Sequence, residues 1–144
     1  ITRDELIIQE QIEIEEDIEP IRRQDIINNA TSKLEIYELY RITEFENIQK
    51  SFKQFFNLDF EIDHAEALLN NQKQGEHHPN NLQLLLKYHN GKKNKNSWNR
   101  FTFDEQVDYI KKSVALHSLV ADKFEVEIDN KILDSLLNRL KEIY

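Results

Sequence analysis

The chain has 144 residues, a formal net charge of −8, two glycines and two prolines, and charged side chains make up 32 % of it, which indicates one ordinary domain dominated by helices. The absence of cysteine excludes disulfide frameworks, thiolate zinc sites and cysteine nucleophiles, and the short apolar runs exclude a membrane span. The acidic N-terminus is unlike a secretory signal, so we expect a soluble intracellular protein, and the absence of methionine indicates a trimmed chain or a piece of a longer one.

The first predicted element is an acidic helix over residues 4–21, although the stretch QIEIEED within it alternates as a strand would. Isoleucines recur there at helical intervals, at Ile7, Ile14, Ile18 and Ile21. Ser32 and Glu35 have the spacing of a capping box, which predicts a second helix to about residue 56. The apolar stripe expected on this helix consists of Leu34, Tyr37, Phe45, Ile48, Phe52 and Phe55.

The middle of the chain predicts a small β-hairpin. In the stretch LDFEIDH, apolar and acidic residues alternate with the period of a strand that has one buried face, and this strand ends at Asp63 and His64. Residues 65–80 are polar and irregular. The stretch LQLLL then predicts a second short strand, and HNGKKNKNSW predicts a short basic helix or a loop.

Two helices are predicted in the last third of the chain. Thr102 and Glu105 form a second capping box, which opens a helix through about Leu119 with inward side chains at Phe103, Val107, Ile110 and Val114. The stretch FEVEI, residues 124–128, suggests a brief strand. Asp129 then caps a final helix. Its apolar stripe comprises Ile132, Leu133, Leu136, Leu137, Leu140 and Ile143.

The charge is distributed unevenly along the chain. Residues 1–60 carry 14 acidic and 7 basic side chains, whereas residues 77–103 carry no carboxylate. The basic side chains of this second segment are Lys87, Lys92, Lys93, Lys95 and Arg100. Because polyanions bind to local clusters of Lys and Arg, the segment predicts nucleic-acid binding through Lys87, Lys92, Lys95 and Arg100, and a merely solvated basic face is the alternative.

Four polar residues of the hairpin region have the chemistry of a hydrolytic site. Asp63 and His64 are neighbours on a strand, so a carboxylate can hold a cation while an imidazole, with an ordinary pKa near neutrality, takes a proton. Asn81 precedes the second strand, where it can hold the ring of His64 in place. Asn90 lies nine positions later, and its amide oxygen can be a second ligand. Such oxygen ligands favour Mg²⁺ or Mn²⁺.

The elements DH, NLQLLL and HNGKK, in this order over residues 61–95, resemble the HNH nucleases, the ββα-metal or His-Me finger group. The resemblance implies that His64 is the general base and that Asp63 and Asn90 hold one divalent cation, with Mg²⁺ the first choice. It also implies that Asn81 stabilises the hairpin and orients His64, and that Lys93 faces a phosphate. The expected fold is α+β and mostly helical, with a ββα-metal finger over 58–100, an acidic helical region over 1–57 and a C-terminal helical region over 101–144, in one compact domain.

Two departures from the family pattern bear on the site. Leu86 and Tyr88 stand where many HNH domains have zinc-binding cysteines, so the finger is expected to lack structural zinc and to be held by apolar packing. His89 adjoins Asn90, and Zn²⁺ or Ni²⁺ is the expected cation if His89 is the ligand, although the spacing favours Asn90. His77 and His78 are interpreted as polar loop residues.

The stretch KKNKNSWNRFTFDEQVDYI, after the motif, resembles certain type II restriction endonucleases. This resemblance implies a site-specific, bacterial or phage enzyme of the cytoplasm that acts on double-stranded DNA as a homodimer or as part of a longer chain. Two alternatives remain open. One is a non-catalytic nucleic-acid-binding or assembly module that retains the HNH scaffold, and the other is a nonspecific or toxin DNase.

Overall fold

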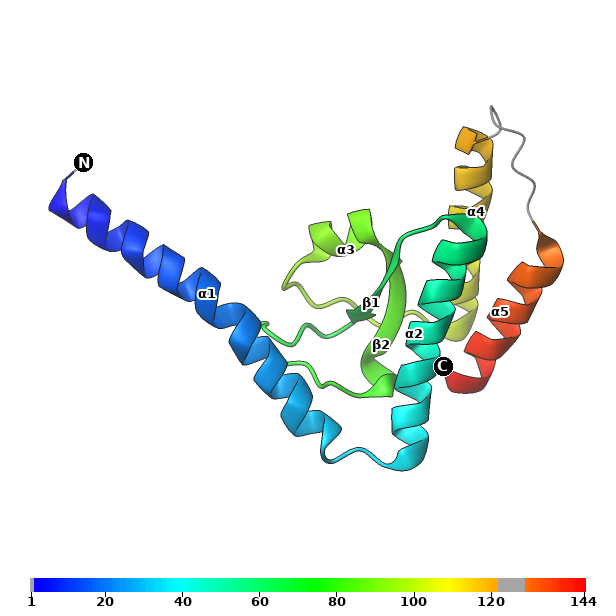
Figure 1. Cartoon of the computed structure of the whole chain (residues 1–144), viewed down its shortest axis with the longest axis horizontal. Coiled ribbons are helices and arrows are strands. Elements are labelled where there is room, and N and C mark those ends of the chain that lie inside the picture. Colours follow the sequence, from blue (N-terminus) through cyan, green and yellow to red (C-terminus); the bar gives the residue numbers. More distant parts are fainter. Residues whose placement is uncertain (1, 122–128) are drawn as a thin grey trace.

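The structure is a computed structural model that describes residues 2–121 and 129–144. Its elements, in chain order, are α1 (Arg3–Thr31), α2 (Ile36–Phe56), β1 (Phe60–His64), the 3-10 turn η1 (Pro79–Asn81), β2 (Leu82–Leu86), α3 (Lys87–Lys93), α4 (Phe103–Ala121) and α5 (Asn130–Ile143) (Figure 1). The α+β, mostly helical fold is therefore confirmed. No described helix combines the length and the apolar character needed to cross a membrane. The brief strand expected at 124–128 lies outside the described residues.

The junction between the first two helices differs from the prediction. The acidic helix is confirmed but longer, because α1 has 29 residues and ends at Thr31; Ser32 caps it, and the N–H of Ser32 donates to the carbonyl of Asn28 at 3.2 Å. The capping box predicted for Ser32 and Glu35 is wrong. Glu35 is itself the residue that precedes α2, and its N–H bonds Oε1 of Glu38 at 3.0 Å. The shift arises because the chain first completes the last turn of α1 and begins α2 three residues later than the spacing suggested.

The hydrophobic core lies where α2, α4 and α5 surround one side of the hairpin (Figure 1). Phe45, Ile48 and Phe52 of the predicted α2 stripe are buried, but Phe55 is 51 % exposed. Phe56 takes the expected place of Phe55, since residues four apart stack on a helix, and the rings of Phe52 and Phe56 lie 5.8 Å apart. The leucines of the α5 stripe are buried as predicted. Tyr37, also expected in the α2 stripe, is exposed instead.

The two predicted strands form one antiparallel hairpin, with register from Phe60 opposite Leu86 to His64 opposite Leu82. The second capping box is also confirmed, since the N–H of Glu105 bonds Oγ1 of Thr102 at 3.2 Å and the reciprocal bond is 3.0 Å long. Asp129 caps α5 as predicted, with Oδ1 accepting from two N–H groups of the first turn at 3.1 Å.

Side chains of α4 cover the outer edge of β2. The N–H of Leu84 donates to Oε1 of Gln106 at 2.8 Å, and Nε2 of Gln106 donates to the carbonyl of Leu84 at 3.0 Å. The N–H of Leu86 donates to the hydroxyl of Tyr109 at 2.9 Å. Because Gln106 is completely buried, these bonds replace the water or third strand that would otherwise pair with the edge.

Replacing Gln106 by leucine is expected to destabilise the fold, because it leaves the N–H and C=O of Leu84 buried without partners. Each unsatisfied group costs about 1–3 kcal/mol, so the free energy of unfolding should fall by about 2 kcal/mol or more, as measured by urea denaturation. Gln54→Leu on the exposed side of α2 is the control, with an expected change within about 0.5 kcal/mol. Equal stabilities of the two variants would contradict the role of Gln106.

Candidate active site

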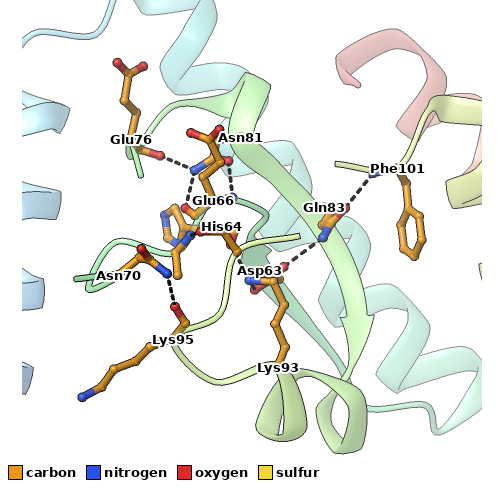
Figure 2. Close-up of polar contacts among 12 residues, drawn as sticks. Asp63, His64, Glu66, Asn70, Glu76, Asn81, Gln83, Lys93, Lys95 and Phe101 are labelled. Atoms are coloured by element: carbon orange, nitrogen blue, oxygen red, sulfur yellow. Dashed lines mark hydrogen bonds and ion pairs between the residues drawn. The ribbon is translucent and has the colours of Figure 1, made fainter. Parts of the chain in front are cut away.

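The end of β1 and the end of α3 meet in a buried polar cluster. Nζ of Lys93 lies 3.1 Å from Oδ1 of Asp63 and donates to the carbonyl of His64 at 2.8 Å. Nε2 of Gln83 donates to Oδ2 of Asp63 at 2.9 Å (Figure 2). Lys93 is only 1 % exposed and Asp63 only 5 %. The resemblance implied that Lys93 faces a phosphate; in the structure its ammonium group forms a buried ion pair with the carboxylate of Asp63.

Asn81 holds the long loop between the two strands. Its Oδ1 accepts from the N–H of Glu66 at 2.8 Å, and its Nδ2 donates to the carbonyls of Glu66 and Glu76 at 2.9 and 2.7 Å (Figure 2). Gly75 completes this arrangement, because a Cβ there would lie 1.8 Å from the carbonyl oxygen of Glu66. These bonds agree with the hairpin-stabilising role expected of Asn81. Within the described residues, no hydrogen bond joins Asn81 to the ring of His64.

The ring of His64 contacts the ring of His77 instead. Its Nδ1 lies 2.8 Å from Nε2 of His64. This contact was not predictable from the sequence, since His77 lies in an irregular polar loop with no strand or helix periodicity to place it. The only available signal was the presence of several histidines in one short window.

His64 is uncharged in this environment. Burial is the main cause that lowers its pKa, to about 3, and the nearby charges of His77, Arg23 and Lys93 act in the same direction. The pKa of His77 is also lowered, first by burial and then by Arg23, while the carboxylate of Glu46 opposes the shift. An imidazole that is neutral at physiological pH retains a nitrogen lone pair, which is the requirement for a general base.

A cavity of about 620 Å³ opens beside this cluster, between α1, β1 and α3. Asp63, His64 and Asn90 all line it. Asn90 is half-buried, and within the described residues its side-chain amide forms no hydrogen bond. His89 points elsewhere, with Nδ1 2.6 Å from the hydroxyl of Tyr109. The structure therefore brings Asn90, and not His89, to the cavity that Asp63 lines.

Helix α1 supplies a further charged residue to this cavity. Arg23 lines the cavity and is exposed, and it forms no ion pair with the side chains that the structure describes. Lys95 also lines it but forms an ion pair with Glu19 of α1. Sequence reasoning missed Arg23, because it precedes His64 by a whole helix and a strand and belongs to a segment that is acidic on average.

The other predicted DNA contacts have different surroundings. Lys87 and Lys92 are exposed on α3, and the ammonium group of Lys92 lies 5.1 Å from the centre of the Tyr88 ring. Arg100 is tied into the fold, since its Nε donates to the carbonyl of Leu82 at 2.8 Å and its guanidinium lies 3.7 Å above the ring of Tyr144. Arg100 thus anchors the C-terminus to the hairpin, and Lys87 and Lys92 remain accessible to a polyanion.

Within 2–121 and 129–144, no group of three or more His, Cys, Asp or Glu side chains is arranged to hold a metal ion. A cation bound here would therefore depend on a mixed set of oxygen donors from carboxylate and amide groups, completed by water or substrate.

The lowered pKa of His64 predicts that the metal-free protein loses stability in acid. The folded pKa of about 3 lies below the ordinary value, so as pH falls below about 6.5 the unfolded chain binds a proton that the folded chain does not. Between pH 6.5 and 5 this group alone should cost about 2 kcal/mol of unfolding free energy. Urea denaturation of the native chain and of His64→Gln at both pH values, with chelator present, isolates the effect. Equal losses in the two proteins would contradict the prediction.

Comparison of the chain with protein-family models, with curated proteins and with solved structures found no match in any of the three.

Proposed function

We propose that the chain is a metal-dependent endonuclease that hydrolyses DNA phosphodiester bonds, with His64 as the general base. The observation that carries this proposal is one cavity lined by a neutral imidazole, a carboxylate and an amide, which come from His64, Asp63 and Asn90. A β-hairpin is followed by a short basic helix, and the three residues lie at the end of β1 and on α3. This order supports the ββα-metal finger that the sequence resembles.

The oxygen donors fit a hard divalent cation. An ionised carboxylate offers about four lone-pair sites, and Gln83 and Lys93 use two of those on Asp63. Asn90 lines the same cavity, and its side-chain amide has an oxygen that can bind a cation. Asp63 and Asn90 would hold Mg²⁺ or Mn²⁺, which would stabilise charge on the phosphate and on the leaving 3′ oxygen. The orientation of His89 toward Tyr109 argues against a Zn²⁺ or Ni²⁺ site that includes it.

The chain's own residues perform the proton transfer. His64 takes a proton from a water molecule, and the resulting hydroxide attacks phosphorus. The bond from phosphorus to the 3′ oxygen breaks, and this oxygen takes a proton from solvent, which leaves a 5′-phosphate and a 3′-hydroxyl. The negative phosphodiester in the cavity favours the imidazolium form and raises the proton affinity of His64 at the moment when it is needed.

Exposed cations of two helices supply the contacts to DNA in this proposal. Lys87 and Lys92 on α3 attract the phosphate backbone of DNA, and Arg23 on α1 contacts the phosphate in the cavity. Arg23 thereby takes the phosphate-binding role that the family resemblance implied for Lys93. We propose double-stranded DNA as the substrate and a site-specific, dimeric restriction endonuclease as the form of the enzyme, because of the resemblance of the segment after α3 to type II enzymes.

Arg23→Ala is expected to weaken DNA binding and to reduce the slope of log affinity against log salt by about one, because one phosphate contact is lost. Arg22→Ala, on the neighbouring exposed residue that does not line the cavity, is the matched control. Fluorescence anisotropy with a labelled duplex over a range of salt concentrations measures both slopes. Identical slopes for the two variants would remove Arg23 from the proposed contacts.

The direct test is incubation of the purified chain with supercoiled plasmid and with a phage genome, in Mg²⁺, in Mn²⁺ and in chelator. Discrete fragments that disappear with chelator would support a site-specific, metal-dependent nuclease. A metal-dependent smear would support the nonspecific DNase instead. Intact DNA under every condition would overturn the nuclease proposal.

A second candidate function, a non-catalytic nucleic-acid-binding module, is favoured by one observation. The ammonium group of Lys93 already neutralises Asp63, so the cluster is complete as a structural element without a metal ion. This candidate predicts DNA binding of similar strength with metal and with chelator, together with no cleavage.

A further inference from the structure

The ring of His77 lies against the ring of His64, and hydrogen bonds from Asn81 stabilise the loop that carries His77. The loop bonds of Asn81 include one to the carbonyl of Glu76, the residue directly before His77. The two rings have centroids 5.1 Å apart and are tilted by 47°. His77 is half-buried, and the distance of 2.8 Å between its Nδ1 and Nε2 of His64 is that of a good hydrogen bond.

This hydrogen bond determines which nitrogen of His64 carries the proton. Each neutral imidazole has one N–H, so one ring donates and the other accepts. If His64 donates from Nε2, its Nδ1 keeps a lone pair and can take a proton from water. If His77 donates from Nδ1, His64 accepts at Nε2 and carries its own proton on Nδ1, so neither of its nitrogens is free to act as a base.

The surroundings of His77 favour the first arrangement. A second cavity, of about 410 Å³, is lined by His64, His77, Glu46 and Arg23. Glu46 is the carboxylate of this lining, and it acts on His77 in the direction that favours a proton on its ring, whereas burial and Arg23 act more strongly in the opposite direction and keep the ring neutral, with a single N–H. Since Nδ1 of His77 faces His64, a proton carried on Nε2 of His77, the nitrogen that does not face His64, leaves Nδ1 as the acceptor.

We propose that His77 is the positioning residue of the site: its Nδ1 accepts a hydrogen bond from Nε2–H of His64 and keeps Nδ1 of His64 free for the proton of the attacking water. The inference rests on the proposed nuclease function. In this proposal the residue that orients the general base is His77 and not Asn81, whose side chain forms hydrogen bonds to the loop instead.

The first arm of the test is NMR of ¹⁵N-labelled protein near neutral pH, without DNA or metal. Long-range ¹H–¹⁵N correlation of the imidazole rings should show the proton of His64 on Nε2. His77→Asn should preserve this tautomer, because the amide oxygen of asparagine can accept in place of Nδ1. His77→Leu should give a mixture of the two tautomers. A native chain with the proton of His64 on Nδ1 would overturn the proposal.

The second arm is steady-state cleavage of a duplex that contains a mapped site. His77→Leu should lower kcat by about 10–100-fold with KM unchanged, as is usual when the partner that orients a functional histidine is lost, and His77→Asn should recover most of the rate. His117→Asn on α4 controls for the substitution itself. An unchanged kcat in His77→Leu, or equal losses in both His77 variants, would overturn the proposal.

The two arms separate this inference from the proposed function. A native chain that shows the expected tautomer but cuts no DNA overturns the nuclease, and with it the catalytic purpose of the contact, while the contact itself stands. A chain that cuts DNA with His64 in the other tautomer overturns the role of His77 alone.

Discussion

The His64→Ala variant is expected to cleave DNA at least about 100-fold more slowly than the native chain, which is the lower end of the usual contribution of a general base. The loss should appear in kcat, because alanine cannot take the proton of the attacking water. Affinity for duplex DNA should change little, since His64 is buried and the exposed cations of α1 and α3 provide the attraction. Single-turnover cleavage and anisotropy on the same duplex measure the two quantities separately.

The matched control is His117→Ala, a half-buried histidine on α4 that lies outside the cavity lining. It should cleave at the native rate. Cleavage by His64→Ala within about threefold of the native rate would refute the assignment of the base. A variant with weakened DNA binding as well as slow cleavage would point to a disturbed hairpin, so circular dichroism and urea denaturation of the variant accompany the assay.

The second large effect is expected from Lys93→Met, which should lower the free energy of unfolding by about 3–5 kcal/mol, the usual result of removing one partner of a buried ion pair. Methionine approximates the length of lysine but leaves Asp63 as a buried charge with only Gln83 as a partner. The carbonyl of His64 loses its donor as well. Urea denaturation at neutral pH measures the loss.

Two further variants decide whether the charge is responsible. Lys92→Met, on the exposed neighbour, should change stability by less than about 0.5 kcal/mol. Adding Asp63→Asn to Lys93→Met removes the uncompensated charge and should restore a large part of the stability. If the double variant is as unstable as Lys93→Met, lost packing and not the unpaired carboxylate explains the effect.

The parts of the fold that follow from local patterns were predictable from the sequence. Alternation of apolar and polar residues placed β1, and the caps at Thr102 and Asp129 placed the beginnings of α4 and α5. The predicted N-cap at Ser32 was wrong because a serine three residues before a glutamate also occurs where one helix ends and the next begins soon after. The spacing alone does not show whether such a serine caps the end of one helix or the beginning of the next.

Three residues of the candidate site were named from the sequence, but Arg23, His77 and the contacts among the side chains were not. Asp63, His64 and Asn90 do line one cavity. That Lys93 turns inward to Asp63 depends on the path of the chain through α3, and the contact of His77 depends on a loop whose course is set by long-range bonds. Neither contact has a periodic signal, because periodicity reports the face of an element and not its partner.

The cover that α4 places over β2 bears on how copies of this chain can associate. A two-stranded sheet normally exposes N–H and C=O groups that can pair with a strand of another molecule, and this is a common route to aggregation. Here the N–H and C=O of Leu84 and the N–H of Leu86 are taken by Gln106 and Tyr109, and Arg100 takes the C=O of Leu82. The β2 edge cannot add a strand from a neighbouring molecule, so any partner that meets the chain on this side must pack against helix surfaces.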